Sequence, residues 1–142
     1  MINVIENTKD ASLIIHLGDY SRDAHFVSSL FENIPFRTIK GNNDYLQSDP
    51  EEMLLNISGR KIFLAHGHKY GVKLSLEKIK KHAKELNVDI LLFGHTHIPL
   101  CEKSNSLNIM NPGSASKWHA RNATYGIIEL TGNSIETKIR TI

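Results

Sequence analysis

Residues 89–97 read Asp-Ile-Leu-Leu-Phe-Gly-His-Thr-His, an apolar run that stops at a glycine and two histidines. A short continuous apolar run of this kind is typical of a strand buried on both faces of an α/β sheet. The same pattern occurs three more times, in runs that end at Gly18-Asp19, Gly41-Asn42-Asn43-Asp44 and His66-Gly67-His68. Because ligands collect beyond the carboxyl ends of strands in such sheets, we expect these four loops to converge on one site.

The rest of the pattern predicts an α/β domain. Helices are expected over residues 22–33 and 76–86, where apolar side chains recur at helical spacing. Strands are expected over residues 13–17, 36–40, 53–57, 61–65, 89–93, 100–103, 107–110, 124–130 and 135–141. This order predicts a two-sheet β-sandwich flanked by helices. No linker or repeat divides the chain, so we expect one domain over residues 1–142.

The bulk composition excludes few functions. The formal net charge is only +2, and Lys78, Lys80, Lys81 and Lys84 form the solvated face of a predicted helix, which argues against nucleic acid as a partner. Nucleic-acid binding through that helix stays a third, weaker hypothesis. The single cysteine, Cys101, precludes an internal disulfide and fits a reducing compartment. No apolar run approaches the roughly 20 residues of a membrane helix. A cytoplasmic protein without membrane contact is therefore expected.

The four polar loops carry the ligand types of divalent metal ions. Eight histidines are present, and four of them form the pairs His66/His68 and His95/His97. Carboxylate, amide oxygen and imidazole suit hard to borderline cations, and the absence of a thiolate disfavours a structural cysteine-type zinc site. Two metals about 3.5–4 Å apart would clamp a phosphate oxygen and activate a water. Asp19 is the natural bridging ligand, because a carboxylate can share its charge between two cations.

The order and spacing of these blocks resemble a known family. Gly-Asp, Gly-Asn-x-Asp, His-Gly-His and Gly-His-Thr-His are similar to the motifs of the calcineurin-like metallophosphoesterases, and most of all to the YfcE-type small prokaryotic phosphodiesterases. Residues 111–114 (Asn-Pro-Gly-Ser) and 125–130 also resemble that branch. The likeness covers about residues 12–142. It implies the metallophosphoesterase fold and hydrolysis of a small phosphate ester by a metal-activated water.

The resemblance also implies roles for individual residues. Asp19 matches the bridging aspartate. The ligands that share the second metal with it are matched by Asn42, His66 and His95. A ligand of the first metal is matched by His97. The candidate catalytic residues are Asp19, Asn42, His66 and His68, where His68 either contacts the substrate phosphate or orients its loop. The implied cofactors are two divalent metal ions, which could be Mn, Ni, Zn or Fe. The alternative is that this chain binds only one such ion. A homo-oligomer stays open.

Several neighbouring residues have two interpretations. Asn43 stands where larger family members carry a histidine that protonates the leaving group, and an amide cannot do so, which favours leaving groups of low pKa. Asp44 either supports a ligand or caps a turn. His16 is expected to be a hydrogen-bonded core residue. Tyr45, Trp118 and Arg121 either line a substrate pocket or belong to the packing and surface.

The chain departs from the family pattern at its start. The family begins with a strand that ends in Asp-x-His and supplies two ligands to the first metal, whereas residues 1–9 resemble the tail of the helix that follows this strand. The first metal would then keep two protein ligands, and a sheet edge would be exposed. Truncation of an active-type ancestor is the favoured explanation. The alternatives are a catalytically impaired remnant, a second chain over the edge, or a protein-interaction scaffold, the use made of this fold by the small retromer subunit.

Overall fold

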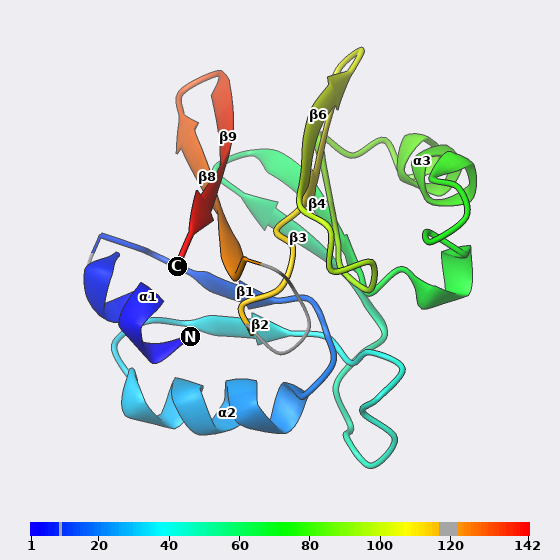
Figure 1. Cartoon of the computed structure of the whole chain (residues 1–142). Helices are drawn as coiled ribbons and strands as arrows, with labels where there is room; N and C mark the ends of the chain where they lie inside the picture. The colour runs from blue at the N-terminus through cyan, green and yellow to red at the C-terminus, as the bar shows by residue number, and fades with distance from the viewer. Residues whose placement is uncertain (9, 117–121) are drawn as a thin grey trace.

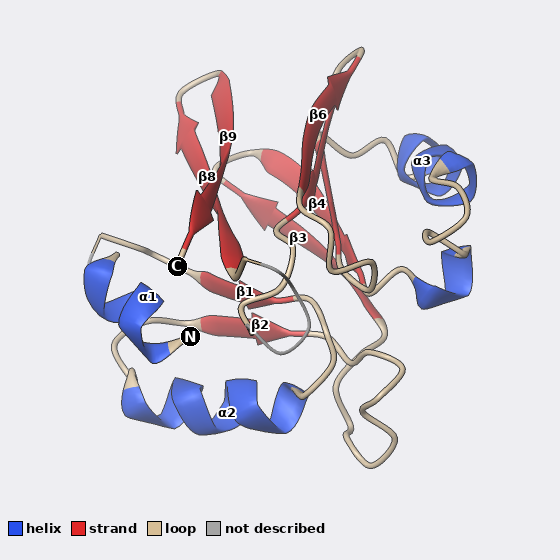
Figure 2. Cartoon of the chain, in the orientation of Figure 1, coloured by secondary structure: helices blue, strands red, loops and turns tan. Residues whose placement is uncertain are grey.

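The computed structural model describes residues 1–8, 10–116 and 122–142, and their helices and strands follow the order expected from the sequence (Figure 2). The helices are α1 (Ile2–Asn7), α2 (Ser21–Leu30), the 3-10 helix η1 (His68–Tyr70) and α3 (Glu77–Glu85). The strands are β1 (Ile14–His16), β2 (Phe36–Thr38), β3 (Glu52–Ile57), β4 (Arg60–Ala65), β5 (Ile90–Phe93), β6 (Leu100–Ser104), β7 (Leu107–Asn111), β8 (Thr124–Thr131) and β9 (Ser134–Thr141). No helix in this part of the chain is long and apolar enough to span a membrane.

A five-stranded mixed sheet forms the centre of the molecule. Its strand order is β3-β4-β5-β7-β6, with β4, β5 and β7 parallel and the two outer strands antiparallel to their neighbours. All four residues of β5 are buried, as its continuous apolar character predicts, and all five residues of β7 are buried although two of them are asparagines. The parallel core sends the loops after β4 and β5 to the same edge of the sheet.

The two faces of this sheet are covered differently. On one face, Ile79 and Ala83 of α3 pack against Phe63, Leu91 and Ile109. On the other face lie the parallel pair β1-β2 and the hairpin β8-β9, with α2 below β1 and β2 (Figure 1). The expected α/β fold with flanking helices is therefore confirmed, and the second layer of the sandwich consists of two separate two-stranded pieces.

Strand β1 differs from its expectation. The run over residues 13–17 predicts a strand buried on both faces, but Ile14, Ile15 and His16 are only partly buried. Among the residues that the structure describes, β1 pairs with β2 alone, in parallel register with Ile14 opposite Phe36. Its second edge therefore has no partner strand there, and the side chains lose the cover that a neighbouring strand would give.

The buried centre of the mixed sheet should dominate stability. Leu91→Ala, in the middle of β5, removes a side chain that is 0% exposed, and we expect it to lower the free energy of unfolding by about 2–5 kcal/mol. Leu54→Ala, in the edge strand β3 of the same sheet, serves as the matched control because Leu54 is 56% exposed. Its cost should stay below about 1 kcal/mol. Equal losses of the two variants in urea unfolding would contradict this picture of the core.

Candidate metal centre

Three strand ends bring their polar side chains together. Asp19 follows β1, Asn42 follows β2 and His66 follows β4. His66 Nε2 lies 3.1 Å from Asn42 Oδ1 and 3.5 Å from Asp19 Oδ1. The loop after β5 adds His95, whose ring centroid lies 5.1 Å from that of His66. Loops that are far apart in the sequence thus meet at one edge of the two sheets.

The close approach of these loops depends on Gly18, which precedes Asp19. Its φ is +91°, in the left-handed region that side chains disfavour. A Cβ at this position would lie 2.6 Å from the backbone nitrogen of Gly41 and 2.7 Å from His66 Nδ1. Any larger residue would therefore push the β1 loop away from the loops that carry Asn42 and His66.

The hydrogen bonding of His66 indicates what the cluster can hold. Its Nδ1 lies 2.7 Å from the carbonyl oxygen of Leu17, which can only accept, so Nδ1 carries the proton. In the neutral ring, Nε2 then presents a lone pair to Asn42 Oδ1 and Asp19 Oδ1. A proton on Nε2 could be donated to only one of these two oxygens. A cation can accept electron pairs from Nε2, Asn42 Oδ1 and Asp19 Oδ1 at the same time.

The spacing of these three atoms fits a shared cation. Ligands about 2.1 Å from a zinc-sized ion lie roughly 3.0–3.4 Å from one another in octahedral or tetrahedral geometry. Of the two distances around His66 Nε2, 3.1 Å lies within this range and 3.5 Å lies just above it. Imidazole, amide oxygen and carboxylate are also ligands that divalent ions accept. The residues therefore fit a divalent cation.

Backbone strain gathers at the same loops. Asp19, Tyr20, His95 and His97 have φ angles of 62°, 60°, 66° and 58°. A left-handed conformation costs a residue with a Cβ about 1–2 kcal/mol. The other described residues of this kind occupy ordinary turns, namely Ser58, Asn87 and Asn105. Strain concentrated in loops that present metal-ligand side chains is typical of a functional site.

Asn43 has a contact that its sequence position did not indicate. Its backbone N–H donates to Asp19 Oδ1 at 3.0 Å, and its side-chain Nδ2 donates to Asp19 Oδ2 at 2.9 Å. Two bonds to two oxygens fix the plane of the carboxylate. Each oxygen keeps a further lone pair for another partner. Asn43 is therefore a positioning residue for Asp19.

Asp44 joins two of the loops through their backbones. It is 5% exposed, and its carboxylate accepts from the N–H of Ser21 at 2.9 Å and of Gly41 at 2.8 Å. Burial alone would raise the pKa of Asp44, but the backbone donors at Gly41, Ser21 and Asp19 outweigh it and lower the pKa below 3.8. Of the two interpretations of Asp44, the cap that ties loop 41–44 to the start of α2 is the one the contacts support.

Two histidines of the cluster, His95 and His68, have lowered pKa values. Burial, followed by the nearby positive charge of Lys73, lowers the pKa of His95 to about 4. Burial also lowers the pKa of His68, together with the charges of His66 and Lys69. The ring centroids of His66, His68 and His95 lie 5.1–6.0 Å apart. Neutral imidazoles are the form that binds metal, so His95 and His68 need not lose a proton at neutral pH.

Other expected site residues are less closely joined to this cluster. His97 ends the turn after β5 and is half-buried, so its role as a ligand of a first metal stays a prediction. In residues 1–8, 10–116 and 122–142, no three His, Cys, Asp or Glu side chains form a complete metal-binding group. The close set here contains Asp19 and His66 from those types, and its third member is the amide of Asn42.

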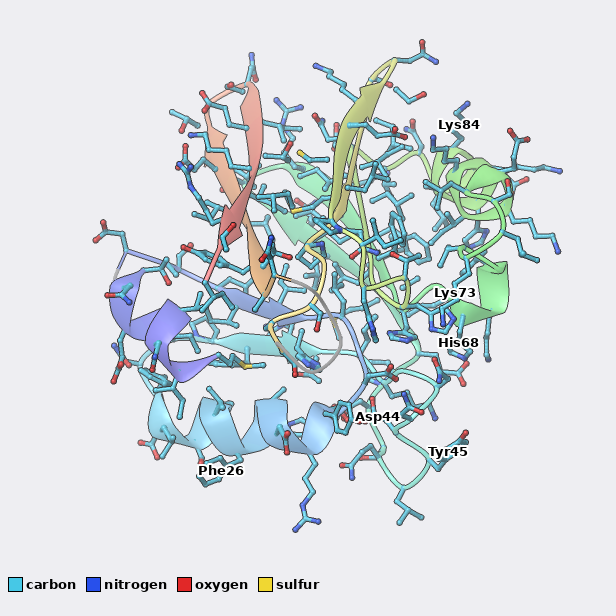
Figure 3. The ribbon with its side chains drawn as sticks, in the orientation of Figure 1. Phe26, Asp44, Tyr45, His68, Lys73 and Lys84 are labelled. Carbon is cyan, nitrogen blue, oxygen red and sulfur yellow. The ribbon has the colours of Figure 1, made fainter. Side chains whose placement is uncertain are left out.

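The remaining expectations have mixed outcomes. His16 is half-buried, but its Nδ1 has no hydrogen-bond partner within the described residues, so the expected hydrogen-bonded core role is not fulfilled at that atom. Tyr45 is 87% exposed on the loop after β2, which makes it a surface residue (Figure 3). Trp118 and Arg121 lie outside the described residues.

Asn111 is a supporting residue whose role the sequence did not reveal. It is fully buried at the end of β7, where its Nδ2 donates to Gly94 O at 2.8 Å and to Thr96 Oγ1 at 2.9 Å. Its Oδ1 accepts from the N–H of Gly113 at 2.9 Å. These three bonds hold the turn that carries His95. An asparagine that ends an apolar strand is the one sequence signal that could have suggested this.

Comparison with known proteins finds a family model and relatives that all point to phosphoesterases. A family model described as the calcineurin-like phosphoesterase superfamily domain matches residues 1–133. The probable metallophosphoesterase YsnB of Bacillus subtilis is 32% identical over 126 residues, which are 88% of this chain and 72% of YsnB. Phosphodiesterase YfcE of Escherichia coli K12 is 30% identical over 103 residues, which are 64% of this chain and 50% of YfcE.

A solved structure supports the same assignment. The crystal structure of a conserved protein from Streptococcus pneumoniae TIGR4, described as a predicted phosphoesterase, has a TM-score of 0.81 and 26% identity to this chain. The match covers 99% of this chain and 80% of the pneumococcal chain. The resemblance inferred from the four motifs is therefore confirmed, while the matches span only part of each relative's own length.

The role of Asp44 predicts a pH-dependent loss of stability. Asp44→Asn leaves one amide oxygen for two backbone donors and turns an NH₂ group toward one of them, so it should cost about 1–3 kcal/mol at pH 7. Because the folded pKa is lowered, the stabilisation by the carboxylate is present above about pH 4 and is lost as the pH falls through the folded pKa.

The gap between the wild type and Asp44→Asn should therefore narrow below pH 4 in urea unfolding. Asp23→Asn is the control, because Asp23 is an exposed carboxylate in the first turn of the same helix, α2. A gap that stays constant between pH 3 and pH 7 would contradict the assigned hydrogen bonds.

Proposed function

We propose a phosphoesterase activity for this chain, which belongs to the calcineurin-like phosphoesterase superfamily. The relatives named metallophosphoesterase and phosphodiesterase support hydrolysis of a phosphate ester. The observation that carries the proposal for the chain itself is the convergence of Asp19 Oδ1, Asn42 Oδ1 and His66 Nε2. Two oxygen donors within 3.5 Å of an imidazole nitrogen suit a cation, which phosphate hydrolysis uses.

The metal requirement is the finer part of the proposal. We assign one divalent cation to Asp19, Asn42, His66 and His95. The family is typically dependent on two metal ions, and His97 together with Asp19 would serve the second. When bound, such ions lower the pKa of a water nucleophile and stabilise negative charge on phosphate oxygens. The ligand types allow Mn, Ni, Zn or Fe.

The chain's own residues supply positioning around this centre. Asn43 fixes both oxygens of Asp19, and the Leu17 carbonyl fixes the proton of His66 on Nδ1. His68 lies with its ring centroid 5.4 Å from that of His66, and its Nδ1 has no hydrogen-bond partner in the described part of the chain. The proximity of the two rings supports His68 as the contact to a phosphate oxygen or a water at the centre.

The residue at position 43, where a leaving group would need a proton, sets the expected substrate preference. Asn43 has no proton that titrates near neutral pH, so it cannot act as the acid that protonates a departing oxygen. Leaving groups of low pKa, such as phenolates with electron-withdrawing groups, should depart without that help. A small phosphodiester or phosphomonoester is the proposed substrate, and a reducing, cytoplasmic setting suits the single Cys101.

Hydrolysis of bis(4-nitrophenyl) phosphate with Mn²⁺ or Ni²⁺ tests the proposal. The wild type should turn over the diester and should lose this activity when the metal is removed by a chelator. Asp19→Asn should lower kcat/KM by about 100-fold, because the cation loses its carboxylate ligand. His25→Gln serves as the control, since His25 pairs with Asp49 on the surface. A folded protein with no turnover above the buffer rate would refute the hydrolase.

A protein-interaction scaffold is the second candidate function. It is favoured by the lack, within the described residues, of a complete group of three His, Cys, Asp or Glu ligands. Calorimetric titration of the folded chain with Mn²⁺ and Zn²⁺ separates the two candidates. The hydrolase requires binding that Asp19→Asn weakens, whereas a folded chain that takes up neither ion would favour the scaffold.

A further inference from the structure

The loop between His68 and α3 is anchored close to the candidate centre. Val72 is 5% exposed, and its N–H returns to the carbonyl of Gly67 at 3.5 Å. A Cβ on Gly67 would lie 2.8 Å from Val72 Cγ2, so the side chain of Val72 sits directly against the residue between the two histidines. This buried contact fixes the starting point of Lys73, the next residue along the chain.

Lys73 places a positive charge at the edge of this centre. Its side chain is exposed, and it lies on the same side of the molecule as His68, whereas Lys84 lies at the far end of α3 (Figure 3). Val72, the residue before Lys73, packs against Gly67, which stands between His66 and His68. The ring centroids of His66 and His68 lie 5.4 Å apart, and that of His95 lies 5.1 Å from that of His66. Lys73 therefore begins one residue from a contact with the loop that carries two histidines of the cluster.

Within the described residues, no carboxylate pairs with Lys73. Lys69, in the same loop, pairs with Glu51, and Lys80 on α3 pairs with Glu102. Across the described residues, none of the lysine ion pairs involves Lys73. Lys69 and Lys73 thus differ in one respect that matters for an anionic ligand. A carboxylate already pairs with Lys69, whereas no described carboxylate pairs with Lys73.

We propose that Lys73 is a substrate-binding residue whose ammonium holds a non-bridging oxygen of the phosphate group. The inference rests on the proposed phosphoesterase function and adds a determinant of substrate charge. A lysine ammonium is a compact point charge on a flexible stem, which suits a phosphate that arrives from solvent. Its attraction doubles between a singly charged diester and a doubly charged monoester, so Lys73 favours phosphate groups with two negative charges.

Titration with inorganic phosphate, followed by calorimetry, tests the contact itself. We expect Lys73→Met to weaken phosphate binding about 10-fold at saturating Mn²⁺, and Lys73→Arg to stay within about 2-fold of the wild type. Lys69→Met is the matched control, because it removes an equal charge from the same loop but one that Glu51 already neutralises. The melting temperature and the Mn²⁺ titration of each variant show whether the fold and the metal are retained.

Two substrates test the charge preference. Lys73→Met should reduce kcat/KM for 4-nitrophenyl phosphate more than for bis(4-nitrophenyl) phosphate, and high salt should shrink the difference. Phosphate affinity equal to that of the wild type, or equal losses on both substrates, would overturn the inference. If the wild type bound phosphate but hydrolysed neither ester, the proposed function would fail, and weaker phosphate binding by Lys73→Met would still support the role of Lys73.

Discussion

The hydrogen bond from His66 Nδ1 to the Leu17 carbonyl is the contact on which the candidate centre depends. His66 follows β4 of the mixed sheet and Leu17 follows β1 of the other layer, so this 2.7 Å bond joins the two layers at their common edge. It also fixes which nitrogen of His66 faces Asp19 and Asn42. The carbonyl of His66 accepts from the N–H of Gly94 at 3.1 Å, which adds the turn of His95. One residue thus sets the relative positions of three loops.

The sequence predicted the parts of this arrangement that depend on local pattern. Apolar runs such as residues 89–93 identify buried strands, and the polar residues that follow them identify the edge where the candidate site lies. The contacts it could not predict join residues that are distant along the chain. Asp44 bonds the backbone of Ser21, 23 residues earlier, and the pairing of Lys69 with Glu51 spans 18 residues. The partial exposure of β1 likewise depends on what lies beside it and not on its own apolar residues.

The candidate centre combines one carboxylate with neutral histidines, and a lysine lies outside them. Asp19 is the carboxylate closest to His66, while Asp44 is committed to backbone donors. His95 and His68 have lowered pKa values and stay neutral at pH 7. A divalent cation held by Asp19 and neutral ligands would keep a net positive charge, because a single carboxylate offsets only half of it. An incoming phosphate would then meet positive potential from the cation and from Lys73, which lies farther out.

Asn43 shows how one side chain can trade proton transfer for rigidity. An imidazole in its place could transfer a proton near neutral pH, whereas the amide of Asn43 cannot and instead donates to Asp19 Oδ2, beside its own backbone N–H on Oδ1. Fixing both oxygens reduces the reorganisation that the carboxylate would undergo when a cation binds. In the proposed reaction Asn43 positions the carboxylate and leaves the departing oxygen without an acid. The barrier should therefore depend steeply on the pKa of the leaving group, and that dependence is what distinguishes this centre from one that carries a histidine at position 43.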